Sequence, residues 1–126
     1  MKYALLSVNP AKLCAILSFL LLAGSLFAKR AAPQAVTPVS YNEIKYSAPN
    51  DNGRIGYVQA SDAAGKLLFR ITVFHTKINP SLDEDVQWVF ITDMKLAGRS
   101  LLVKDEKSRC YVINLETKAV ERKWRC

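Results

Sequence analysis

The side chains best suited to chemistry are few, and they are scattered along the chain. His75 is the only histidine, so a histidine-based metal site or a Ser-His-Asp relay would have to be built around it. It ends an alternating apolar segment, where a half-exposed structural histidine is the simpler interpretation. The chain has no Gly-x-Ser-x-Gly turn, no Cys-x-x-Cys pair and no glycine-rich phosphate loop. The sequence therefore predicts a protein that is not an enzyme and that uses no metal and no cofactor.

Carboxylates are densest at Asp83, Glu84 and Asp85. Their oxygens are of the type that Ca²⁺ prefers, but the spacing of a calcium loop is absent, which favours a solvated acidic connection. Asp62 and Asp93 form a second candidate pair, of the kind that hydrolyses glycosides across a groove. We interpret Asp62 instead as a turn former and Asp93 as the polar end of a strand. The acidic residues at 83–85 are predicted to contact a partner.

A second candidate contact lies at the C-terminus, where Lys118, Arg122, Lys123 and Arg125 surround Trp124. Cations beside an exposed indole suit an anionic polymer or a lipid surface. The alternative is an edge strand whose positive charges discourage aggregation between sheet edges. Lys123 and Trp124 are the residues predicted to touch a partner here.

The cysteines indicate one disulfide. Cys14 lies inside an apolar N-terminal run, so removal of that run would leave Cys110 and Cys126 as a pair in an exported chain. Their bridge would close a loop of about 16 residues and stabilise the fold by about 3 kcal/mol in the chain-entropy model. The alternative is two free thiols.

The N-terminal segment 1–28 has the pattern of a secretory signal peptide. Two early lysines precede the apolar run 13–27, which is too short to span a bilayer comfortably, and small residues follow near 23–28. The alternative is an uncleaved membrane anchor over residues 13–28. Of the 18 basic residues four lie in or beside this segment, and without them 14 basic residues face 11 acidic ones, a net charge of +3. This weak excess argues against a nucleic-acid partner.

The remainder predicts an all-β domain at 41–126, preceded by a Pro- and Ala-rich linker at 29–40. Segment 65–75, GKLLFRITVFH, alternates apolar and polar residues most cleanly, and we expect the other strands to pair around it. Turn signals recur about every ten residues, and no apolar spacing of three and four is sustained after residue 40. The expected fold is a single antiparallel meander or partly closed barrel of six to seven strands, preceded by a signal helix. The expected strands are 41–47 at an edge, 54–60, 65–75, 86–94 in the centre, 100–104, 109–115 and 119–124.

Two hairpins, 56–69 and 111–120, share a pattern of strand, Asp or Asn, short turn and strand, with Asp62 and Asn114 at the turns. This pattern resembles the blade repeat of quinoprotein-type β-propellers. The resemblance implies a way of turning a hairpin, and it implies no quinone cofactor and no catalytic residue. Segment 85–93, together with Leu101-Leu-Val and Tyr111-Val-Ile-Asn-Leu, also looks like small exported bacterial β-domain proteins of unassigned function.

These features together predict a non-enzymatic binding or structural module of the bacterial cell envelope, periplasmic or secreted. Its partner is expected to be another envelope protein or a cell-wall polymer, and only an uncleaved N-terminal segment would join it to a membrane. The alternative is an inhibitor or accessory subunit of an extracytoplasmic enzyme. In that case the connection 77–85 is the expected contact loop.

Overall fold

The computed structural model describes residues 30, 31 and 33–126, and the segment from Ala32 to Cys126 forms a compact unit. The predicted signal peptide and its helix lie outside the described residues. Within the described residues, no helix has the length and apolar character needed to cross a bilayer.

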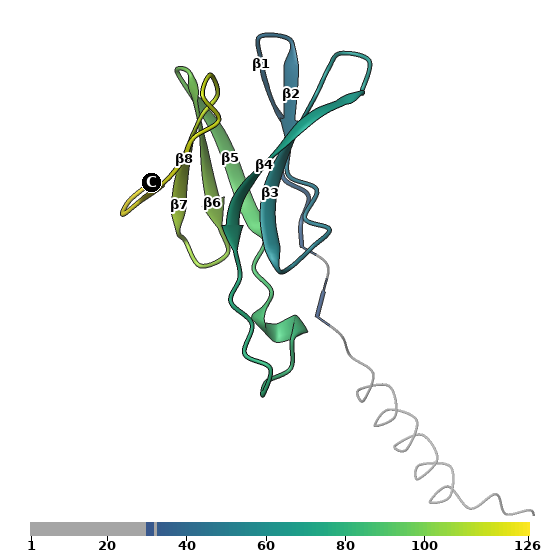
Figure 1. Cartoon of the computed structure of the whole chain (residues 1–126), viewed down its shortest axis with the longest axis vertical. Coiled ribbons are helices and arrows are strands. Elements are labelled where there is room, and N and C mark those ends of the chain that lie inside the picture. The colour runs from purple at the N-terminus through teal and green to yellow at the C-terminus, as the bar shows by residue number, and fades with distance from the viewer. Residues whose placement is uncertain (1–29, 32) are drawn as a thin grey trace, which may run out of the picture. The chain divides into compact units, whose positions relative to one another are not determined.

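The compact unit is all-β, with eight strands in two antiparallel four-stranded sheets (Figure 1). The prediction of an all-β fold is confirmed, but the chain forms two sheets where we expected one meander or barrel of six to seven strands. The first sheet has the order β1 (Val39–Tyr41), β2 (Ile44–Ser47), β3 (Ile55–Ser61) and β4 (Leu67–His75). The second has the order β5 (Ile91–Ala97), β6 (Ser100–Asp105), β7 (Cys110–Asn114) and β8 (Val120–Lys123).

The extra strand arises because the expected strand 41–47 is broken by a tight turn. Asn42 and Glu43 both have positive φ values, 50° and 65°, and they connect β1 to β2. Two positive φ values in succession are typical of the hairpin turn whose twist matches that of its strands. Asn42 tolerates this conformation, and it is the one sequence signal for the break.

The segment around which we expected the sheet to pair is an edge strand, because β4 pairs only with β3. Two register shifts leave Leu68 and Val73 as extra residues on β4. The second shift interrupts the alternation, so that Val73 and Phe74 are both buried although they are consecutive. The alternation from Leu67 to Val73 therefore correctly predicted a strand, but the expectation that the other strands pair around it is wrong.

The expected central strand 86–94 is also different in the structure. Residues Asp85–Gln87 form a short 3₁₀ helix, η1, and the strand β5 begins only at Ile91. β5 lies at the edge of the second sheet and pairs with β6 alone. The run of apolar residues that suggested a doubly buried strand instead places Val89 and Phe90 in a buried connection between the sheets.

Both sheets contribute to one hydrophobic core. Phe74 of the first sheet stacks on Tyr111 of the second, with ring centroids 5.4 Å apart. Two glycines make room for aromatic rings, since a Cβ on Gly56 would overlap the Phe74 ring and one on Gly53 would overlap Trp88. The largest fully buried side chains come from both sheets and from the segment that links them: Tyr46, Ile91, Leu101, Ile113, Val58, Val89, Val103 and Asp105.

The predicted linker 29–40 contributes to this unit. Val36 is 9% exposed and belongs to the core, and β1 begins at Val39, before the expected domain boundary. An Ala- and Pro-rich composition is typical of linkers, but one well-placed valine is enough to fix such a segment on a core.

Each sheet contains one turn in which an aspartate side chain accepts the same pair of backbone hydrogen bonds. Oδ1 of Asp62 accepts hydrogen bonds from the backbone N–H groups of Ala64 and Lys66, two and four residues later. Oδ1 of Asp105 accepts from Lys107 and Arg109, again two and four residues later. Asn114 also accepts two backbone N–H groups, but its turn is one residue longer. The interpretation of Asp62 as a turn former is thus confirmed.

Candidate functional site

The structure does not assemble the expected candidates for catalysis. His75 is exposed at the end of β4, opposite Ile55 of β3. Asp62 and Asp93 belong to different sheets, where Asp62 holds a turn and Asp93 forms an ion pair of 3.9 Å with Lys95. Within residues 30, 31 and 33–126, no group of three His, Cys, Asp or Glu side chains is arranged to hold a metal ion.

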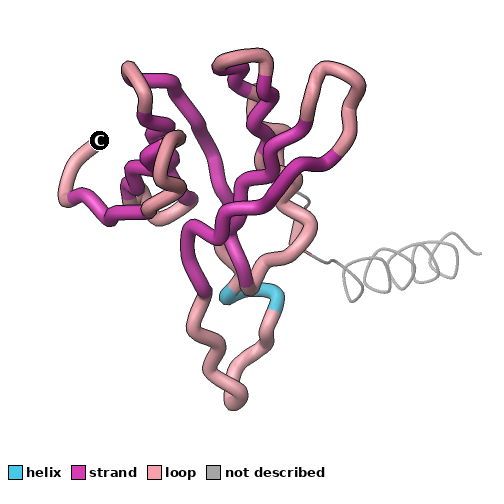
Figure 2. The backbone as a smooth tube through the Cα atoms, turned by 45° about the horizontal axis from the view of Figure 1, so that its top comes forward, coloured by secondary structure: helices cyan, strands magenta, loops and turns pink. Residues whose placement is uncertain are grey.

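The acidic residues 83–85 lie in the connection between the two sheets, which we call the 77–88 loop. Figure 2 shows this loop extending away from both sheets, with η1 on its returning limb. Both ends of the loop are attached to one segment, because the Thr76 N–H donates to the Arg54 carbonyl and the Val89 N–H donates to the Gly53 carbonyl, at 2.7 and 3.1 Å. Ends that meet in this way are typical of a compact Ω-loop.

The side chain of Gln87 lies within the loop and binds its backbone at several points. Its Oε1 accepts the Asn79 N–H at 2.7 Å. Its Nε2 donates to the carbonyls of Asn79 and Asp83, each at 3.0 Å, and more weakly to that of Leu82 at 3.4 Å. The Asn79 side chain adds a local turn by accepting from the Ser81 N–H and hydroxyl. Backbone groups that would otherwise bind water are thus held by one amide.

Glu84 joins the loop to the first sheet. Its carboxylate binds the Arg54 guanidinium through both oxygens, with Arg54 Nη2 2.6 Å from Oε2, and it accepts the Trp88 indole N–H at 3.3 Å. These hydrogen bonds, first that from Arg54 and then that from Trp88, lower the pKa of Glu84 to about 2. Paired in this way, Glu84 holds the loop rather than offering a free negative charge.

The loop also exposes two apolar side chains that the sequence did not single out. Leu82 is 59% exposed and Val86 is 69% exposed. Asp83 is exposed beside Leu82, whereas Glu84 and Asp85 are half-buried. No periodicity marks Leu82, and Val86 and Gln87 were assigned to the expected strand 86–94. The roles of these residues depend on the path of an irregular loop.

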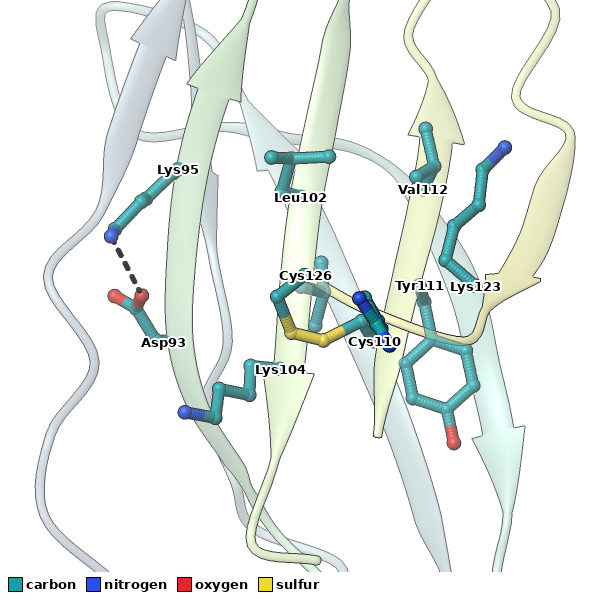
Figure 3. A pocket seen from close by; sticks show the side chains of 11 residues that line it. Asp93, Lys95, Leu102, Lys104, Cys110, Tyr111, Val112, Lys123 and Cys126 are labelled. Carbon is teal, nitrogen blue, oxygen red and sulfur yellow. Dashed lines mark ion pairs between the residues drawn. A yellow bond between two sulfur atoms is a disulfide. The ribbon is translucent and has the colours of Figure 1, made fainter. Parts of the chain in front are cut away.

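The second predicted contact region lies on the outer face of the second sheet and the C-terminal tail. Cys110 of β7 and Cys126 lie side by side with their Cα atoms 5.4 Å apart, and their sulfur atoms are joined (Figure 3). Such a separation suits a disulfide. The tail is therefore held against the sheet, while Trp124 remains completely exposed.

Beside the disulfide there is a pocket of about 230 Å³ that crosses all four strands of the second sheet (Figure 3). Leu102 and Val112 lie in it as register neighbours on β6 and β7. Lys123 borders both this pocket and a second one, of about 310 Å³, which also includes Trp124. The structure thus places Lys123 and Trp124 next to concave surface, and it places the acidic residues 83–85 in a separate loop.

The comparisons offer no relative from which a role could be transferred to either region. No protein-family model, no curated protein and no solved structure matches this chain.

Proposed function

We propose that this chain is a non-enzymatic binding module of the bacterial cell envelope, exported by its N-terminal segment, and that it contacts a partner protein through the 77–88 loop. The observation that carries the proposal is the fixed backbone of this loop. Gln87 binds it from within, and Arg54 and Glu84 attach it to the first sheet.

A fixed loop supports binding because it loses little conformational entropy when a partner orders it. Each rotamer-rich side chain or flexible segment that must be immobilised costs affinity, and a loop that already has its bound shape avoids that cost. Leu82 and Val86 then supply apolar area that is left in water in the isolated protein. A partner can bury apolar side chains on a rigid support without the cost of ordering the loop.

A second candidate function is inhibition of an extracytoplasmic enzyme, or service as its accessory subunit. The extension of the loop away from both sheets favours it, since such a loop suits a concave site on a partner (Figure 2). The two functions share the contact surface and differ in what the partner does. They are distinguished by assaying the captured partner with and without the added chain.

The proposal is tested by crosslinking the full chain in its native host, followed by mass spectrometry of the complexes. The test variant is Leu82→Ser combined with Val86→Ser, which removes both exposed apolar side chains and leaves Gln87 and Glu84 in place. The matched control is Leu67→Ser combined with Leu68→Ser, because these two residues are also exposed, at 45% each, but lie on β4.

We expect a partner protein that is captured by the wild type and the control and is lost at least about tenfold with the test variant, a change equivalent to 1.4 kcal/mol. Equal capture by both variants would show that the loop is not the contact surface. Mass spectrometry of the recovered chain also gives its mature N-terminus, and a full-length cytosolic product would contradict the export part of the proposal.

A further inference from the structure

We propose that the pocket on the outer face of the second sheet binds a small aliphatic carboxylate. In this site Leu102 and Val112 contact the aliphatic body, and Lys104 and Arg125 bind the carboxylate oxygens. This site is separate from the 77–88 loop and would persist if the function proposed for that loop were wrong.

The apolar part of the pocket follows from the register of the sheet. Lys95, Leu102 and Val112 form one row across β5, β6 and β7, and the next row consists of Asp93, Lys104 and Cys110. All of these residues border the pocket. Leu102 and Val112 are only half-buried, although they lie in the two interior strands of the sheet, and the disulfide lies beside them (Figure 3). Aliphatic side chains and sulfur offer contact area to a hydrocarbon chain and no hydrogen bonds to its body.

The charge of the pocket selects an anion. Four cationic side chains border it, those of Lys95, Lys104, Lys123 and Arg125, against one acidic side chain, that of Asp93. Lys95 pairs with Asp93 at 3.9 Å, and Lys123 pairs with Glu121 at 3.7 Å.

The other two cations remain available. Across the described part of the chain, neither Lys104 nor Arg125 has an acidic partner within ion-pair distance. A carboxylate has two oxygens that accept hydrogen bonds, which matches these two unpaired cations.

The disulfide holds the C-terminal tail on the face of the sheet that carries Lys104. Lys104 lies opposite Cys110 in the register of β6 and β7, and Cys110 is joined to Cys126, the neighbour of Arg125 in the chain. Without that bond the terminal residues would be free to leave the sheet, and Arg125 with them. The volume of about 230 Å³ is smaller than that of typical pockets for drug-sized molecules, so the ligand is expected to be a medium-chain acid of about the size of octanoate.

Three probes separate the contributions of charge and of hydrocarbon. Octanoate has both, octanol has the hydrocarbon body without the charge, and acetate has the charge without the body. Each is titrated into the full chain while the backbone amide resonances are followed by NMR. We expect octanoate to shift the resonances of Leu102, Val112 and Arg125, and to bind at least about tenfold more tightly than either other probe, a difference of 1.4 kcal/mol.

Two substitutions test the assigned cations. Lys104→Gln and Arg125→Gln each remove one exposed positive charge. Each is expected to weaken octanoate binding at least about threefold, a value in the upper part of the range for exposed charge pairs. Lys45→Gln is the control, because Lys45 is equally cationic and exposed but lies on β2 of the first sheet. Cys126→Ser is expected to weaken binding as much as Arg125→Gln does, with the resonances of the first sheet unchanged.

The proposal is overturned if octanol binds as tightly as octanoate, because the pocket would then be merely apolar. It is also overturned if octanoate shifts no resonance of the second sheet in the folded protein, or if Lys45→Gln weakens binding as much as Lys104→Gln. Loss of partner capture in the crosslinking experiment on the 77–88 loop has no bearing on any of these outcomes.

Discussion

The two sheets have the same strand order and share one turn design, yet different interactions hold them together. In the second sheet, Asp105 is 1% exposed and binds the Arg109 guanidinium at 2.7 Å and the Tyr111 hydroxyl at 3.2 Å. In the first sheet, the corresponding Asp62 is only partly buried, and within the described residues its side chain binds only the backbone N–H groups of Ala64 and Lys66. The same local hydrogen bonds can therefore serve as a surface turn or as part of a core, depending on what packs over them.

Tyr111 shows how closely this buried group is connected to the rest of the core. Its hydroxyl donates to Asp105 while its ring stacks on Phe74 of the first sheet. Burial raises the pKa of Tyr111, and the negative charge of Asp105 raises it further. The second sheet thus concentrates polar and apolar contacts at one corner, whereas the turn at Asp62 stands apart from the core.

Substitution of the two aspartates gives the largest expected difference between the sheets. Asp105→Ala removes an acceptor from two backbone N–H groups, a hydroxyl and a guanidinium, and should lower the free energy of unfolding by about 3 kcal/mol, as is typical when one partner of a buried pair is removed. Asp62→Ala removes two exposed hydrogen bonds and should cost about 1 kcal/mol. Urea denaturation of both variants measures these values.

Asp105→Asn provides a less drastic version of the same test, since it keeps the Oδ1 acceptor for the two backbone N–H groups and replaces only Oδ2, which accepts from Arg109 and Tyr111, with an NH2 group. Its free energy of unfolding should lie between those of Asp105→Ala and the wild type. Equal values for Asp62→Ala and Asp105→Ala would mean that burial does not distinguish the two turns.

Reduction of the disulfide should reveal a difference in local stability between the two sheets. The bond closes a loop with a sequence separation of 16, and its loss should cost about 3 kcal/mol or somewhat less in the chain-entropy model. Amide hydrogen exchange of the reduced protein should show lost protection in β8, next to the released tail, and retained protection in β3. Equal losses in β3 and β8 would show instead that the bond stabilises the whole unit.

Most strands were predictable because their signals are local. Alternation and turn residues identified β3, β4, β6, β7 and β8 to within one or two residues at each end. The division into two sheets was not predictable in the same way. It depends on where the chain leaves one sheet and enters the next, and the segment 76–90 carries apolar residues in a pattern that also suits a strand.

The candidate contacts show the same limit. Asp83 and Glu84 were recognisable as an acidic cluster, but the role of Glu84 is set by Arg54, which lies 30 residues earlier in the chain. Gln87 is the main support of the loop, and nothing in its local sequence distinguishes it from a surface glutamine. The contact between two side chains 30 residues apart and the contacts of Gln87 with the backbone of an irregular loop both depend on the completed fold, and single-sequence patterns do not contain them.

A lower pH should selectively weaken the attachment of the 77–88 loop to the first sheet. This is the smallest of the expected effects. The pKa of Glu84 is lowered to about 2 in the folded protein, from an ordinary value near 4.5, by its hydrogen bonds to Arg54 and Trp88. Because the folded-state pKa is the lower one, the contribution of Glu84 is fully present above about pH 4.5 and is lost as the pH falls toward 2. Attachment of the loop should weaken across that window, while the disulfide of the second sheet does not titrate.

Trp88 reports this change, since its indole N–H donates to Glu84. The only other tryptophan is Trp124, so Trp124→Phe leaves a single fluorophore. We expect the emission maximum of Trp88 to shift between pH 4.5 and 2 in this variant. When Glu84→Gln is added, the emission maximum should be shifted at every pH and should no longer depend on pH. If both proteins show the same transition, then some other carboxylate controls the loop, and the bond between Arg54 and Glu84 is not what joins it to the first sheet.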